Sequence, residues 1–174
     1  YGETMGGPEG YGFLMAALGA GMLLGSLSAS LVSDVALGKL LVASSIVSGA
    51  CWLAAVAVGW LPGTVALFLL AFVPIGATNV LLISVIQAAV PQVLLGRVSA
   101  VLGSASAFAM PIGALAGGAA AAALGPVLVM AVGGVVFVAL GGYFAAVPSL
   151  RRLPVAHEID SLARGGSIAA AAEE

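Results

Sequence analysis

Residues 64–89, TVALFLLAFVPIGATNVLLISVIQAA, decide the fold, because they form a long apolar stretch without an ionisable side chain. A helix rises about 1.5 Å per residue, so about 20 apolar residues cross the roughly 30 Å hydrocarbon core of a bilayer. Four more stretches of this kind occupy residues 11–33, 40–60, 98–124 and 127–147. The sequence therefore predicts an all-α fold, a polytopic transmembrane bundle of about five helices.

The composition agrees with a membrane protein and excludes other classes. Hydrophobic residues make up 62% of the chain and charged residues 7%, and the mean hydropathy is +1.23. Soluble domains are about half apolar and about a quarter charged. A water-soluble fold is therefore excluded, and membrane lipid is the expected partner. The net charge of -2 leaves no basic surface for nucleic acid, so no nucleic-acid partner is expected.

Short turn-forming or charged segments separate the five stretches, at residues 34–39, 61–63, 91–97 and 125–126. An unpaired backbone group costs several kcal/mol in hydrocarbon, so such short links force neighbouring helices into antiparallel hairpins. All charged residues lie outside the five stretches, as the high cost of a charge at membrane depth requires.

The basic residues predict the orientation of the chain. If the five stretches cross the membrane alternately, Lys39, Arg97 and the three arginines beyond residue 147 fall on the same side. The positive-inside rule makes that side cytoplasmic. We therefore expect a multi-pass protein of the cell membrane with its N-terminus outside and its C-terminus in the cytoplasm. In this arrangement 1–10 is an extracellular loop, 11–147 the transmembrane bundle and 148–174 a cytoplasmic tail.

Residues that could support enzyme or metal chemistry are sparse. Cys51 is the only cysteine and His157 the only histidine, and His157 lies in the tail. A hydroxyl such as that of Ser104 has no histidine at membrane depth to activate it. The sequence predicts no enzyme activity, no cofactor and no metal.

Small residues recur at every fourth position in two of the stretches. Such a stripe lets two helix backbones approach closely in lipid. The residues expected to pack in this way are Ala17, Gly21, Gly25, Ala29, Gly113, Gly117 and Ala121. The stripes favour either static packing or a sliding contact. By contrast, stretches 40–60 and 127–147 have bulkier faces, which predicts that they face lipid.

Stretch 64–89 has few polar side chains in its interior. They are Thr78, Asn79, Ser84 and Gln87. Uncharged polar groups at membrane depth require hydrogen-bond partners. They therefore either join helices by hydrogen bonds or line a polar patch that contacts a transported molecule.

Two segments resemble one family of transporters. Residues 90–98, VPQVLLGRV, followed by Pro111-Ile112-Gly113 and Gly117-Gly118, are similar to the tenth-to-eleventh-helix region of the major facilitator superfamily, especially bacterial-type drug or siderophore exporters. Residues 6–12, GGPEGYG, resemble the start of that family's eighth helix. The resemblance covers nearly the whole chain. It implies family helices eight to twelve of a C-terminal half, with a missing N-terminal half as partner.

The resemblance also implies roles for individual residues. The first and fourth stretches would form the interface between the two halves, and the third would line the central cavity. A cytoplasmic gate or loop would include Asp34, Gly38, Lys39, Gly96 and Arg97, although Val35 stands where the family motif has arginine.

The resulting functional prediction is a fragment of a secondary active transporter that works by alternating access. Its charge-free interior favours export of a hydrophobic or amphipathic small molecule, with Thr78, Asn79, Ser84 and Gln87 along the path. Two alternatives remain open. One is a non-transporting or truncated membrane scaffold that associates through its Gly and Ala stripes. The other is a half-size transporter that works as an oligomer.

Overall fold

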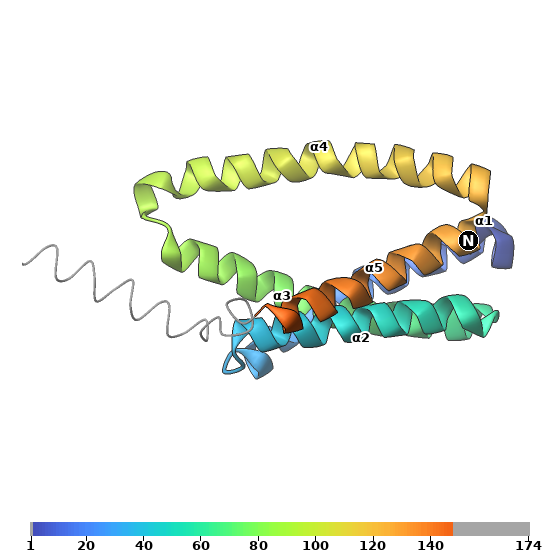
Figure 1. Ribbon diagram of the computed structural model, residues 1–174, viewed down its shortest axis with the longest axis horizontal. Coiled ribbons are helices and arrows are strands. Elements are labelled where there is room, and N and C mark those ends of the chain that lie inside the picture. The colour runs from blue at the N-terminus through green and yellow to red at the C-terminus, as the bar shows by residue number, and fades with distance from the viewer. Residues whose placement is uncertain (1, 148–174) are drawn as a thin grey trace, which may run out of the picture.

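The computed structural model describes residues 2–147, and all regular structure in this part of the chain is helical (Figure 1). The elements are α1 (Gly2–Ser28), the short 3-10 helix η1 (Ala29–Val32), α2 (Leu37–Val58), α3 (Leu61–Ala89), α4 (Gln92–Leu124) and α5 (Pro126–Ala146). Five of these described helices are long and apolar enough to cross a membrane, which confirms the predicted fold class. The predicted tail at 148–174 lies outside the described residues.

The first helix begins earlier than the sequence predicted. α1 starts at Gly2, whereas residues 1–10 were expected to form a loop. The helix is interrupted at Gly6 and at Gly7, which has φ +62° and ψ -155°. This backbone conformation is open essentially to glycine alone. Pro8 follows, and proline is tolerated in the first turn of a helix because the backbone N–H groups there have no partner inside the helix. The segment ahead of the first long apolar stretch is therefore a kinked helical extension.

The connections between helices follow from local backbone chemistry. α2 ends at Gly59, whose φ of +63° is the left-handed conformation that commonly terminates helices. Pro62 and Pro126 then occupy the first turns of α3 and α5. These turns are short, so each helix reverses direction relative to the one before it, as Figure 1 shows.

The helices pack in an order that differs from their order along the chain. α1 packs against α3, α3 against α2, and α2 against α5. α2 and α3 thus each pack against two other helices, and the prediction that the second and fifth stretches chiefly face lipid is wrong for the α2–α5 contact. In lipid, two helices pack together where small residues let their backbones approach closely. Bulky side chains elsewhere on the helices do not determine that contact.

α4 stands apart from the other helices. It arches beside the bundle in Figure 1, and its main contact is with α5, the helix to which it is joined. None of its residues is buried. Nearly the whole surface of this long helix is therefore available to lipid or to another protein surface.

An aromatic cluster joins α2, α3 and α5. The Trp52 ring lies 4.8 Å from Phe68, 5.8 Å from Phe72 and 6.2 Å from Phe137, measured between ring centroids. The Trp52 indole Nε1–H donates a hydrogen bond of 2.9 Å to the carbonyl oxygen of Met130 in α5. Trp52 is half-buried, and its ring contacts together with this hydrogen bond fix α5 against α2.

Candidate functional site

The small-residue stripe of α1, which continues into η1, lies against α3. Ala17, Gly21, Gly25 and Ala29 are all buried. A Cβ atom added at Gly25 would collide with the backbone carbonyl of Val73 and would lie 2.9 Å from the backbone nitrogen of Ala77. The two helix backbones are therefore in direct contact, and a larger residue has no space at this position.

Gly76 contributes to this contact from the α3 side, and the sequence did not single it out. A Cβ atom at Gly76 would collide with the backbone carbonyl of Met22 in α1. A single glycine surrounded by larger residues gives no stripe, so the four-residue spacing that identifies the α1 face could not have found it.

The second predicted stripe has no partner in the described part of the chain. Added Cβ atoms at Gly113 and Gly117 would meet nothing within 4 Å, and Ala121 is only half-buried. The structure therefore does not bring the stripes of α1 and α4 together. The α1 stripe contacts α3, and the α4 stripe is open.

A second close helix contact, between α2 and α5, was missed. A Cβ atom at Gly49 would lie 2.7 Å from the Cγ2 atom of Val138 and 3.0 Å from the carbonyl oxygen of Gly134. One at Gly141 would lie 3.2 Å from the Cβ atom of Ser45. Ser45 and Gly49 are four residues apart on α2, and that spacing was a readable signal in the sequence.

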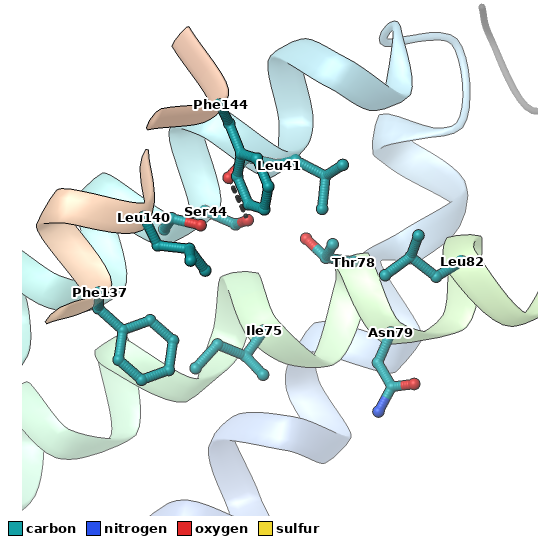
Figure 2. A pocket seen from close by; sticks show the side chains of 10 residues that line it. Leu41, Ser44, Ile75, Thr78, Asn79, Leu82, Phe137, Leu140 and Phe144 are labelled. Carbon is teal, nitrogen blue, oxygen red and sulfur yellow. Dashed lines mark hydrogen bonds between the residues drawn. The ribbon is translucent and has the colours of Figure 1, made fainter. Parts of the chain in front are cut away.

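Several polar side chains border a cavity between α2, α3 and α5. This cavity measures about 300 Å³, at the lower end of the range for small-molecule sites. Its polar lining consists of Ser44 and Ser45 from α2 and Thr78 and Asn79 from α3 (Figure 2). Two of the four predicted path residues, Thr78 and Asn79, therefore border the same cavity.

Two of the three hydroxyl groups that line this cavity already use their protons. Ser44 Oγ donates to the carbonyl oxygen of Leu41 at 3.2 Å, and Thr78 Oγ1 donates to the carbonyl oxygen of Pro74 at 2.8 Å. Figure 2 shows the Thr78 hydroxyl directed from α3 toward Ser44 on α2. Each oxygen keeps lone pairs that can accept a hydrogen bond from another molecule.

The rest of the cavity wall is apolar. Phe137, Leu140 and Phe144 come from α5, and Leu41, Ile75 and Leu82 come from the two other helices. Among the residues that the structure describes, none with an ionisable side chain lines the cavity. The site can therefore hold an apolar molecule and offers hydrogen-bonding groups without a charge.

Asn79 borders two cavities. Its amide points away from Ser44 and Leu41 in Figure 2. It also lines a groove of about 350 Å³ between α1 and α3, together with Met22 and Ser26. The amide therefore lies on the α1 side of α3, and its partners differ from those of Thr78.

Ser84 and Gln87 lie apart from the main cavity. Ser84 is exposed and donates a hydrogen bond of 2.9 Å to the carbonyl oxygen of Val80 in its own helix. Gln87 is exposed and borders a smaller cavity of about 220 Å³ between α3 and α4, where Ser99 faces it. The structure thus divides the four predicted path residues among separate sites.

The predicted gate residues lie at the end of the molecule where α1 turns into α2 and α3 into α4 (Figure 1). Asp34, Lys39 and Arg97 are exposed, Gly38 is buried in the first turn of α2, and Gly96 is exposed in α4. The two loops therefore lie at the same end of the molecule. Their role as a gate stays a prediction.

The remaining candidate groups among the described residues are metal-binding side chains, Cys51 and Ser48. Within 2–147 no three His, Cys, Asp or Glu side chains come together in a way that could hold a metal ion. Cys51 is half-buried in α2. Ser48 Oγ, one turn beyond Ser44, is buried without a hydrogen-bond partner among the described residues.

Comparison with known proteins gives no relative. No protein-family model, no curated protein and no solved structure matches the chain. The similarity to major facilitator transporters therefore rests on the sequence motifs alone. The long apolar helices of the described residues indicate a multi-pass membrane protein.

Proposed function

We propose that this chain is part of a secondary membrane transporter that moves a hydrophobic or amphipathic small molecule outward by alternating access. The observation that carries the proposal is the cavity between α2, α3 and α5, with its apolar wall and uncharged hydroxyl groups. Transport sites in such proteins lie between helices at membrane depth. A purely structural scaffold needs no cavity of this kind, because its contacts are made on the outer helix faces.

The open surface of α4 supports the same proposal. Alternating access requires one helical unit to move against another, and small residues allow close contact without interlocking side chains. Gly113 and Gly117 present such a surface, and no described residue covers it. In this proposal α4 faces a second helical unit, while Asp34, Lys39 and Arg97 lie at the cytoplasmic end and help to close it.

Transport by the complete gene product tests the proposal. Cells that lack their own efflux pumps are loaded with apolar fluorescent compounds, and the rate of loss is compared with and without the protein. Leu140→Trp enlarges a residue that lines the cavity. Val135→Trp makes a similar enlargement on the same helix, at an exposed position that lines none of the described cavities.

We expect Leu140→Trp to reduce the rate of efflux strongly and Val135→Trp to leave it near that of the unmodified protein. Equal expression of the two variants in the membrane is the control. Efflux that is indistinguishable with and without the protein for every compound, or that survives Leu140→Trp unchanged, would contradict the proposal.

The exposed face of α4 also favours a second candidate, a membrane scaffold that associates through this helix. In that case Gly113→Leu with Gly117→Leu abolishes association, measured by cross-linking in native membranes. Leu140→Trp has no effect in that case, since the cavity is unused. The two candidates therefore differ in the effect of Leu140→Trp, which impairs only the transporter.

A further inference from the structure

Two hydroxyl groups of the cavity between α2, α3 and α5, those of Ser44 and Thr78, are held as hydrogen-bond acceptors toward a ligand. A hydroxyl group has one proton to donate and two lone pairs that accept. The protons of Ser44 and Thr78 are directed to the carbonyl oxygens of Leu41 and Pro74 in their own helices. A ligand between the helices therefore meets oxygen lone pairs on two sides.

We infer that this cavity selects neutral, mainly apolar molecules that carry a hydrogen-bond donor, such as phenols and aryl alcohols. This inference rests on the proposed function, since it names the class of molecule that the transport site takes. A donor placed between α2 and α3 can reach the oxygen of Ser44 or Thr78, while the rest of the molecule lies against α5.

The aromatic side chains favour an aromatic body for the ligand. Phe137 and Phe144 both line the cavity and lie two helical turns apart on α5. Aromatic rings pair with one another in offset or edge-to-face arrangements. A planar ring between these two side chains would thus be held by contacts that a branched aliphatic molecule cannot make.

The absence of charge in the lining argues against permanent cations and anions. None of the described residues around the cavity is ionisable. Moving a charge from water into such a site is costly unless an opposite charge compensates it. A quaternary ammonium compound also has no N–H or O–H group that could donate a hydrogen bond to the hydroxyl oxygens.

Binding of two matched probes tests the inference. Para-propylphenol carries the donor, and para-propylanisole is its methyl ether without the donor. The full chain is placed in lipid nanodiscs with Trp60→Phe, which leaves Trp52 as the only tryptophan of the sequence. Trp52 stacks on Phe137, a residue of the cavity wall, so its fluorescence reports occupancy.

We expect saturable quenching with the phenol and an affinity about three- to tenfold weaker with the ether, the range set by the net contribution of a neutral hydrogen bond. Partition into lipid would give the opposite order, because the ether is the more apolar probe. Ser44→Ala together with Thr78→Val removes the two hydroxyl groups whose protons are held within their own helices, and should bring the phenol close to the affinity of the ether.

Ser33→Ala is the matched control. Ser33 Oγ also donates to a carbonyl three residues earlier, that of Ser30 at 2.9 Å, and it lines none of the described cavities. This variant should bind the phenol as the unmodified protein does. Near-UV circular dichroism shows whether each variant keeps its fold. Ser44→Ala alone is the second variant if the double substitution does not fold.

Equal affinity for the phenol and the ether, or unchanged phenol binding after removal of both hydroxyls, would overturn the inference. The proposed function would stand in either case, because efflux of apolar molecules does not require a donor. Tighter binding of benzyltrimethylammonium than of the phenol would overturn the argument from charge. If neither neutral probe binds saturably while apolar compounds are still exported and Leu140→Trp still reduces that export, the inference fails and the proposed function stands.

Discussion

Glycine residues determine how closely α1 approaches α3. At Gly21, Gly25 and Gly76 an added Cβ atom would collide with backbone of the neighbouring helix, and backbone cannot move aside as a flexible side chain can. In lipid, where no hydrophobic force drives helices together, this close approach is the main source of attraction. The contact therefore depends on three positions that have no side chain.

Gly25→Ala should lower the stability of the protein. The added methyl group forces α1 and α3 apart, and overpacking of this kind typically costs about 1–3 kcal/mol. The measurement is the midpoint of thermal unfolding in detergent. Gly19→Ala is the control on the same helix, because a Cβ atom there meets nothing within 4 Å. Equal midpoints for the two variants would show that α1 does not pack on α3 as described.

The two tryptophans provide a second pair of matched variants. Trp52→Phe removes the hydrogen bond to Met130 and should cost about 1 kcal/mol, the usual net contribution of one hydrogen bond. Trp60→Phe should change the free energy of unfolding little, since Trp60 is 63% exposed. Denaturant titration in mixed micelles measures both. A larger loss with Trp60→Phe would contradict the packing of α2 against α5.

Sequence spacing predicts a packing face but does not reveal what covers it. The stripe on α1 was predicted directly from its four-residue repeat, and the residues of that stripe are buried. Its partner was expected from the family resemblance to be a second helical unit, whereas the structure places it on α3. Gly76 was missed because a single glycine forms no repeat, whereas the four-residue spacing of Ser45 and Gly49 was present in the sequence and was overlooked.

At the scale of helices, α4 differs from the others in having no buried residue. Its apolar surface is stable in lipid without a protein partner, because lipid tails are as apolar as its side chains. The free face of α4 therefore contributes little to holding together the helices described here.

The double variant Gly113→Leu, Gly117→Leu should leave the unfolding midpoint of this chain almost unchanged. Both positions have open space around them, and leucine is a better helix former than glycine. Thermal unfolding in detergent is the measurement, with Gly21→Leu, Gly25→Leu as the destabilised comparison. A loss of stability similar to that comparison would mean that α4 packs into the bundle.

The roles of α2 and α5 could not be predicted from hydropathy. In a soluble protein the apolar face of a helix identifies its buried side, but every side of a membrane helix is apolar. The bulky residues of these helices suggested a lipid-facing position. The structure instead uses the small residues Ser45, Gly49, Gly134 and Gly141 to bring the two helices together.

At the scale of the whole molecule, the all-α class and the five long apolar helices followed from length and hydropathy, and they are confirmed for the described residues. The helix starts did not follow, since α1 begins at Gly2 and α4 at Gln92, within segments that were expected to be loops. The order of packing did not follow, for the reason just given. The cavity was predicted only in part. Polar residues at membrane depth identified Thr78 and Asn79, but the contribution of Ser44 and Ser45 depends on how α2 packs against α3.

The account as a whole rests on the helices crossing the bilayer with their two sets of loops on opposite sides. Single cysteines can report this directly, because Cys51 is the only native cysteine and can be replaced by alanine. Asp34→Cys and Gln92→Cys probe the end near Lys39 and Arg97, and they leave both basic residues in place. Trp60→Cys and Leu124→Cys probe the other end. All four positions are exposed.

The decisive measurement is labelling of these four variants by a membrane-impermeant maleimide in intact cells and again after permeabilisation. The account predicts that Trp60→Cys and Leu124→Cys react in intact cells, whereas Asp34→Cys and Gln92→Cys react only after permeabilisation. Labelling of all four positions in intact cells, or of one position from each end, would contradict a chain that crosses the membrane alternately.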